Sequence, residues 1–231
     1  MQTVINGKEK SMVKNLAVAL FYTVLFIVLL LSYYSERINQ DLSDSLIRLH
    51  IVAKSDSMQD QALKYRVRDA VIDYMAGKMS GLKNKDNAVS FIKNHLGELE
   101  QAANNAIAEA GLNDHARVSF GKYAFPSKQY GNVILPAGFY DALKIEIGEA
   151  KGQNWWCVMF PPLCFTEDAK GKLDDEYIGI LKEELSEEEF KIIINDGEKE
   201  IPVEIKFKIV EIFQESKIKI ASLFRGLVNA E

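Results

Sequence analysis

The sequence predicts an α+β fold in which an N-terminal transmembrane helix precedes one extracytoplasmic domain. Three observations support this class. An uncharged apolar run lies near the N-terminus, two long segments with helical periodicity follow a short strand, and at least three segments with period-two alternation come after them. This order of elements favours two long helices packed on one face of a mainly antiparallel sheet.

The run from Asn15 to Ser35 contains no charged residue, and about 20 such residues span a bilayer. It ends in LLLSYY, with tyrosines where a secretory signal peptide would carry the small residues of a cleavage site. We therefore expect an uncleaved signal anchor that crosses the membrane through residues 16–34. Lysines precede the run and acidic residues follow it, so the positive-inside rule places the short N-terminus in the cytoplasm.

The chain is accordingly divided into three parts. Residues 1–35 form the cytoplasmic N-terminus and the signal anchor, residues 36–165 form the extracytoplasmic α+β domain, and residues 166–231 form an acidic, partly helical region packed on it or extending it. A net charge of −5 and the lack of a basic stripe argue against a nucleic-acid partner. The glutamates between residues 183 and 189 are typical of a solvated helix face.

The domain begins with a strand and a helix. Residues 44–54 predict a strand with one polar face, on which Arg48 and His50 alternate with apolar residues. Ser55-Asp56-Ser57 supplies residues that cap helix N-termini, and residues 59–79 carry apolar side chains at helical spacing. A helix therefore follows the strand directly.

The period then changes from helical to alternating. Residues 87–110 predict a second helix that ends at Gly111. Strands are predicted over residues 116–125, 140–147 and 155–160 because apolar and polar residues alternate there or turn residues bound the segment.

The C-terminal region is predicted to be mostly helical. Residues 174–185 and 187–194 are acidic and favour helices. Residues 203–209 alternate apolar with charged residues, which predicts a strand, and the pattern after them fits a helix.

The segment from residue 151 to residue 165 (KGQNWWCVMFPPLCF) holds both tryptophans and both cysteines of the chain. On one straight strand Cys157 and Cys164 would lie about 23 Å apart, beyond the reach of a disulfide. Pro161 and Pro162 fold the chain back and remove that objection. Outside the cytoplasm we therefore expect a structural disulfide, with two buried thiols as the alternative.

A catalytic thiol would need a base within hydrogen-bond reach. His50 is the one histidine in a defined context, yet a strand histidine more often serves the structure, so a Cys157/His50 pair is the minor hypothesis. The spacings match no zinc site, and no phosphate-binding or dinucleotide-binding loop is present. We expect no metal, no cofactor and no small-molecule substrate.

A protein partner fits the remaining features better. Trp155 and Trp156 point to opposite faces of their strand, so one is expected in the core and the other at the surface, where it can anchor a partner. On the first helix Arg66 has Asp69 and Asp73 at helical spacing for an ion pair. The partner-binding candidates are Trp155, Trp156, Arg48, His50, Arg66 and Arg68.

Three long segments follow the apolar run in this order: SLIRLHIVAKSDS at residues 45–57, DQALKYRVRDAV at residues 60–71, and YGNVILPAGFYDALKIEIGEAKGQNWWCVMFPPLCF at residues 130–165. They resemble the stage II sporulation protein R family. The resemblance implies a protein made in the forespore and exported toward the mother cell, into the space between the two. There it would activate a membrane-embedded aspartic protease that processes pro-sigma-E. From residue 166 onward no motif is matched.

Two hypotheses from different classes remain. In the first, the domain is a signalling ligand and not an enzyme, and it shifts the protease toward its active state. In the second, it is a cell-envelope hydrolase that uses Cys157 or His50.

Overall fold

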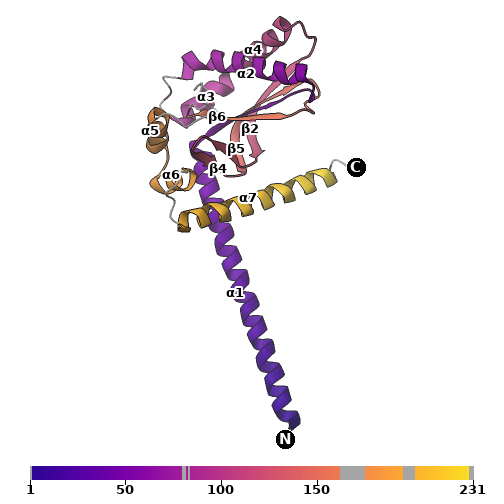
Figure 1. Ribbon diagram of the computed structural model, residues 1–231, viewed down its shortest axis with the longest axis vertical. Helices are drawn as coiled ribbons and strands as arrows, with labels where there is room; N and C mark the ends of the chain where they lie inside the picture. The colour runs from indigo at the N-terminus through magenta and orange to yellow at the C-terminus, as the bar shows by residue number, and fades with distance from the viewer. Residues whose placement is uncertain (1, 80–81, 83, 162–174, 195–200, 229–231) are drawn as a thin grey trace.

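The computed structural model describes residues 2–79, 82, 84–161, 175–194 and 201–228. One long helix, α1 (Gln2–Ser45), projects from a domain built of the remaining helices and strands (Figure 1). The α+β class and the long apolar N-terminal helix are both confirmed.

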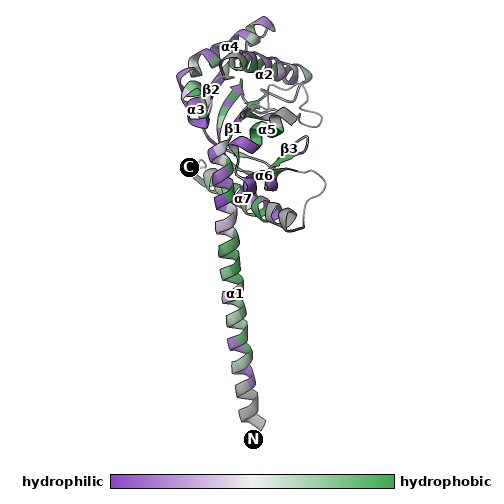
Figure 2. Ribbon diagram, turned by 90° about the vertical axis from the view of Figure 1, so that its left-hand side faces the viewer, coloured by the Kyte–Doolittle hydropathy of each residue, from purple (hydrophilic) through white to green (hydrophobic). Residues whose placement is uncertain are grey.

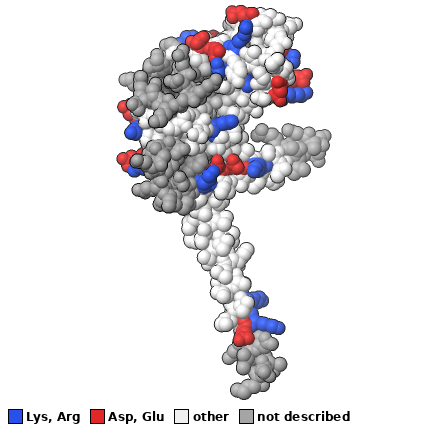
Figure 3. Space-filling view, in the orientation of Figure 1, with Lys and Arg blue, Asp and Glu red and all other residues white. Residues whose placement is uncertain are grey.

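Helix α1 is long and apolar enough to cross a membrane, and no part of its most apolar 18-residue stretch is buried in the protein. Figure 2 shows this stretch as a continuous hydrophobic rod, and Figure 3 shows no charge on it between the N-terminal charges and the domain. The helix does not end where the apolar run ends. Its last turns, with Ile38 and Leu42, are buried in the domain.

A mixed four-stranded sheet forms the centre, in the order β2-β5-β1-β6. Strand β1 (Ile47–Val52) pairs parallel with β5 (Gly138–Ile147) and antiparallel with β6 (Asn154–Phe160), and β2 (Ala116–Phe125) pairs antiparallel with β5. Two of three pairings are thus antiparallel. Between β1 and its parallel neighbour β5 the chain passes through three helices, the edge strand β2 and the β3–β4 hairpin.

Three helices cover one face of the sheet: α2 (Met58–Met79), α3 (Lys85–Asn94) and α4 (Leu96–Glu109). The prediction of a single helix over residues 87–110 is wrong. The chain breaks at His95, whose backbone leaves the helical region (φ −119°, ψ 22°) and whose N–H donates to the Ile92 carbonyl oxygen. The predicted end at Gly111 is confirmed, since this residue has φ +71° and Leu112 N–H closes the turn on Ile107.

The opposite face is covered by segments that are distant in sequence. They are the end of α1, the hairpin β3–β4 (Lys128–Tyr130 and Val133–Leu135), α5 (Asp175–Glu184), α6 (Glu187–Ile193) and α7 (Ile201–Val228). The hairpin was not predicted, because three-residue strands are too short to show a period. With both faces covered, all six residues of β1 are buried, so the polar face predicted for this strand is not at the surface.

The strand predicted over residues 203–209 is also wrong, because α7 is one helix from Ile201 to Val228. Pro202 lies in its first turn, where proline needs no hydrogen-bond partner and favours helix initiation. No turn separates the alternating residues from the helical pattern that follows, and helix formation is cooperative. Tertiary contacts support it, since Val210 and Gln214 are buried and Ser35 of α1 donates to the Val210 carbonyl oxygen at 3.3 Å.

Gly152, in the turn before β6, tests this arrangement. A Cβ there would overlap the Ser55 carbonyl oxygen, and a backbone atom cannot move aside. We expect Gly152→Ala to lower the free energy of unfolding by about 1–3 kcal/mol in a urea titration. The matched control is Gly97→Ala on α4. A Cβ at residue 97 meets no heavy atom within 4 Å, so this variant should gain up to about 1 kcal/mol in the free energy of unfolding. Equal stability of the two variants would contradict the packing described.

Candidate partner-binding site

Arg48, in the central strand β1, is fully buried. Its Nε donates to the Cys157 carbonyl oxygen at 3.1 Å, and its Nη2 donates to the Tyr130 hydroxyl at 2.8 Å. The guanidinium carbon lies 4.5 Å from the centre of the Phe125 ring and 5.1 Å from that of Tyr140. Arg48 therefore joins β1 to β6, to the β3–β4 hairpin and to the aromatic core of this face.

The charge of Arg48 has no carboxylate partner among the described residues, and its Nη1 is buried without a hydrogen bond. A buried charge without an opposite charge is costly, and each aromatic face over a desolvated cation offsets that cost by about 2 kcal/mol. Burial raises the pKa of the Tyr130 hydroxyl, while Arg48 acts in the opposite direction. Aromatic rings and the Cys157 carbonyl oxygen thus hold Arg48 inside the domain, where a partner protein cannot contact it.

His50 lies on the same face of β1 and is 8% exposed. Its ring stacks on Trp156 with 3.8 Å between centroids, and Nε2 forms a 2.7 Å hydrogen bond with Asn154 Oδ1. Phe125 closes the stack from the side, 4.7 Å from Trp156. We call Arg48, His50, Trp156 and Phe125 the buried cluster.

On the helix-covered face, Trp155 forms a second group with Tyr65 and Arg68 of α2. The Trp155 and Tyr65 rings meet edge to face at 5.5 Å, and the Arg68 guanidinium lies 4.7 Å from the centre of the Trp155 ring. Tyr65 is 41% exposed, Trp155 is half-buried, and β6 is an edge strand. These three residues, named here the aromatic patch, expose the Tyr65 ring and parts of the Trp155 ring and of the Arg68 side chain.

The structure separates the residues that the sequence grouped together. Arg48, His50 and Trp156 lie on one face of the sheet, and Trp155 and Arg68 lie on the other. The expectation that one tryptophan is in the core and the other at the surface is wrong, because both are half-buried. Arg66 is exposed, and among the described residues it is Arg68, not Arg66, that pairs with Asp69, at 2.6 Å.

Cys157 is buried and disulfide-bonded, so it offers no free thiol. Cys164, its predicted partner, and Pro162 lie outside the described residues. Cys157 pairs with Leu49 across the strands, whereas His50 pairs with Trp156. Cross-strand partners share a face and neighbours along a strand alternate, so Cys157 and His50 point to opposite faces of the sheet. The Cys157/His50 catalytic pair is therefore not formed.

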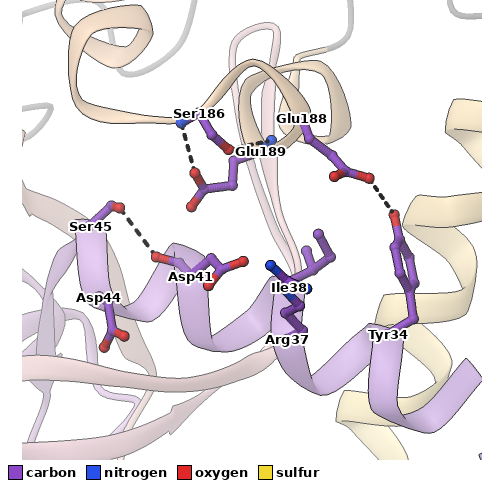
Figure 4. A pocket seen from close by; sticks show the side chains of 9 residues that line it. All are labelled: Tyr34, Arg37, Ile38, Asp41, Asp44, Ser45, Ser186, Glu188 and Glu189. Atoms are coloured by element: carbon purple, nitrogen blue, oxygen red, sulfur yellow. Dashed lines mark hydrogen bonds between the residues drawn. The ribbon is translucent and has the colours of Figure 1, made fainter. Parts of the chain in front are cut away.

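A cavity of about 610 Å³ lies where α1 enters the domain, between α1 and the N-terminus of α6 (Figure 4). Its walls are rich in carboxylates, with one guanidinium among them. The lining residues are Tyr34, Arg37, Ile38, Asp41, Asp44, Ser45, Ser186, Glu188 and Glu189. The net negative charge of this lining favours binding of a cationic group. No group of three metal-ligating side chains occurs in the described part of the chain.

Glu189 has a structural role at this cavity that the sequence did not predict. Its backbone N–H bonds the Ser186 hydroxyl while its own Oε2 accepts from the Ser186 N–H, forming a capping box at the start of α6. Glu189 is 5% exposed, and its Oε1 is buried without a partner among the described residues. The Ser-x-x-Glu spacing ahead of apolar residues was the available signal. The acidic run was interpreted instead as a fully solvated helix face.

Comparison with known proteins identifies the family. A family model described as stage II sporulation protein R matches residues 43–170, more than half of the chain. The stage II sporulation protein R of Bacillus subtilis (strain 168) is 36% identical over 181 residues, which cover 73% of this chain and 80% of that protein. The chain belongs to the stage II sporulation protein R family. No solved structure matches it.

The stage II sporulation protein R match covers β1 to β6 and the three helices on the sheet, and therefore both the buried cluster and the aromatic patch. It begins at residue 43, inside α1, and ends before α5. The apolar part of α1, the acidic cavity's α6 wall and α7 lie outside it.

His50 makes the stability of the domain depend on pH. Burial lowers its pKa to about 4, with Lys144 acting in the same direction, while the bond to Asn154 and the charge of Glu146 act against the shift. In the unfolded chain the pKa is about 6.5, so between pH 6.5 and pH 4 the unfolded state binds more protons. Stability should therefore fall by up to about 3 kcal/mol as the pH drops through this window.

Urea unfolding at several pH values measures this dependence. The control is His50→Gln, which keeps a donor for Asn154 but cannot titrate. Its pH dependence should be flatter over the same window, and identical slopes for both proteins would show that another group is responsible.

For Cys157, we propose Cys164 as the disulfide partner. A bond closing so short a loop stabilises by about 2–3 kcal/mol. The double variant Cys157→Ala/Cys164→Ala should therefore unfold at correspondingly lower urea concentration, and the native protein should resist iodoacetamide until a reductant is added. Labelling of both cysteines in the folded, exported protein without reductant would rule the bond out.

Proposed function

We propose that this protein is an exported sporulation signal that activates a membrane-bound aspartic protease, which in turn processes pro-sigma-E in the mother cell. Family membership supplies the sporulation role. The observation that carries the rest is the continuity of α1, which runs from its apolar part into the buried core at Ile38 and Leu42. An uncleaved α1 would hold the domain against a membrane, within reach of a partner embedded there.

The proposed location is the space between forespore and mother cell, with the N-terminus of α1 in the forespore cytoplasm. The charge pattern around the apolar run supports this orientation. The bonded state of Cys157 supports it independently, because disulfides persist in compartments outside the reducing cytoplasm.

Activation by a ligand requires tighter binding to the active state of the protease than to the inactive one. Changing a protease from about 1% active to about 99% active takes a differential binding free energy of about 5.5 kcal/mol. Two or three contacts made only with the active state would supply that amount, since single dominant interface residues contribute about 2 kcal/mol or more.

The aromatic patch is the contact surface that we propose. Tryptophan, tyrosine and arginine are the residue types that most often dominate binding energies at interfaces, and Trp155, Tyr65 and Arg68 bring all three together at an edge strand. The buried cluster is the weaker candidate, because Arg48 and His50 are enclosed. Of its members, Trp156 retains partial exposure.

The hydrolase hypothesis has no geometric support. A bonded Cys157 provides no thiolate, and His50 points to the other face, with Nε2 on Asn154 and Nδ1 buried. A domain of this construction is better suited to signalling by contact than to catalysis.

The double variant Tyr65→Ala/Arg68→Ala tests the proposed surface. Both side chains are at least partly exposed on α2, so the fold should survive, and loss of two contacts should weaken binding by at least about tenfold. Processing of pro-sigma-E in sporulating cells should fall accordingly. Arg117→Ala is the control, since Arg117 is an exposed arginine on β2, at the opposite edge of the sheet from β6 and outside the patch. Normal processing by a folded, exported double variant would reject the patch as the contact surface.

A further inference from the structure

Helix α7 lies across α1 at the level where α1 enters the domain (Figures 1 and 2). Both views show its axis running sideways relative to α1. At the crossing, Gln214 Nε2 donates to the Ser35 carbonyl oxygen at 3.2 Å, and Lys217 Nζ lies 2.7 Å from Glu36 Oε1. The position of α7 along α1 is thus fixed by polar contacts at residues 35 and 36.

Residue 36 is the first charged position after the apolar run, which extends from Asn15 to Ser35. A helix of that length measures about 31 Å, which matches the hydrocarbon thickness of a bilayer. When α1 spans the membrane, the crossing therefore lies at the boundary between lipid and water. A helix that crosses α1 sideways at this level lies along the membrane surface.

Four large apolar side chains of α7 are exposed: Ile212, Ile220, Leu223 and Phe224, each at 55% to 68%. Their spacing places them on one side of the helix. Val210 and Gln214, which face the domain and α1, are buried on another side. The exposed apolar stripe is therefore not the surface that packs on the protein.

The exposed apolar stripe faces the membrane side of the point where α7 crosses α1. A groove between α1 and α7 is lined by Ser32, one turn before the crossing, together with Phe213, Ser216 and Ile220 of α7. Leu223 and Phe224 follow Ile220 by one turn on the same side. These side chains consequently face the lipid end of α1. Lys217 also lines this groove, but it pairs there with Glu36 at the crossing, and its Nζ lies 5.8 Å from the centre of the Phe139 ring of β5.

We infer that α7 is an interfacial membrane helix, with Ile212, Ile220, Leu223 and Phe224 inserted among the lipids next to α1. Helices of this kind carry basic residues beside an apolar face and bind anionic lipid. α7 has five lysine and arginine residues against three glutamates, within a chain of net charge −5. Lys219 lies next to the stripe, where phosphate groups would meet it. The occupant of this surface is a phospholipid bilayer.

The inference rests on α1 spanning the membrane, as proposed above, and the test separates the two. The full chain is reconstituted in vesicles of phosphatidylcholine and phosphatidylglycerol, with or without bromine on the acyl chains. Bromine quenches tryptophan that touches the acyl chains. Trp155 and Trp156 belong to β6 in the domain, so the native protein gives the unquenched background.

Phe224→Trp should lose most of its added fluorescence in brominated vesicles, and Leu223→Trp, a second reporter on the stripe, should behave alike. Ser222→Trp is the matched control, because Ser222 is exposed in the same turn but off the stripe, and its added fluorescence should persist. Phe26→Trp, within the apolar part of α1, reports whether α1 is inserted and should be quenched.

Quenching at residue 26 with no quenching at residues 223 and 224 overturns the inference and leaves the anchor intact. Such a result would follow if the stripe contacts a protein or a second copy of the chain. No quenching at residue 26 overturns both the anchor and the interfacial helix. Equal quenching at residues 222 and 224 also overturns the inference, since it would mean that α7 has no lipid-facing side.

Discussion

The continuity of α1 is the constraint on which the rest of the structure depends. The same helix supplies the apolar membrane-length segment and, through Ile38 and Leu42, part of the core beneath the sheet. Its end leads within two residues into β1, the central strand. The domain therefore has no flexible connection to the apolar part of α1, and its position relative to α1 is set by packing.

The second constraint is the buried guanidinium of Arg48. It bonds β6 and the β3–β4 hairpin and lies over the Phe125 and Tyr140 rings. A buried charged group is weak evidence for added stability, and where such a group is retained it can specify one arrangement of neighbouring elements. Here that arrangement includes the hairpin that packs against α6, through the bridge between Val133 and Ile194. Arg48 thus serves the fold, while the exposed Tyr65 and the partly exposed Arg68 remain accessible at the surface.

The sequence predicted those elements whose pattern repeats without interruption, such as α2, β2 and β5. It missed the β3–β4 hairpin, whose strands are too short to show a period, and the break at His95, because the nearest glycine, Gly97, lies inside α4 and not at the break. The polar face of β1 was misjudged because its cover comes from α1, α6 and α7, which are distant in sequence. The sequence also grouped Trp155 and Arg68 with Arg48 and His50 as candidates for one site. Alternation along a strand shows that the sheet has two faces, but it does not show which helices cover each face.

The central claim is that the signal acts while α1 still joins the domain to the membrane. The most direct measurement is the intact mass of the protein recovered from sporulating cells that are processing pro-sigma-E, after separation of membrane and soluble fractions. The account predicts a chain in the membrane fraction whose mass includes α1. A shortened chain in the soluble fraction, lacking the residues before the domain while processing proceeds, would contradict it.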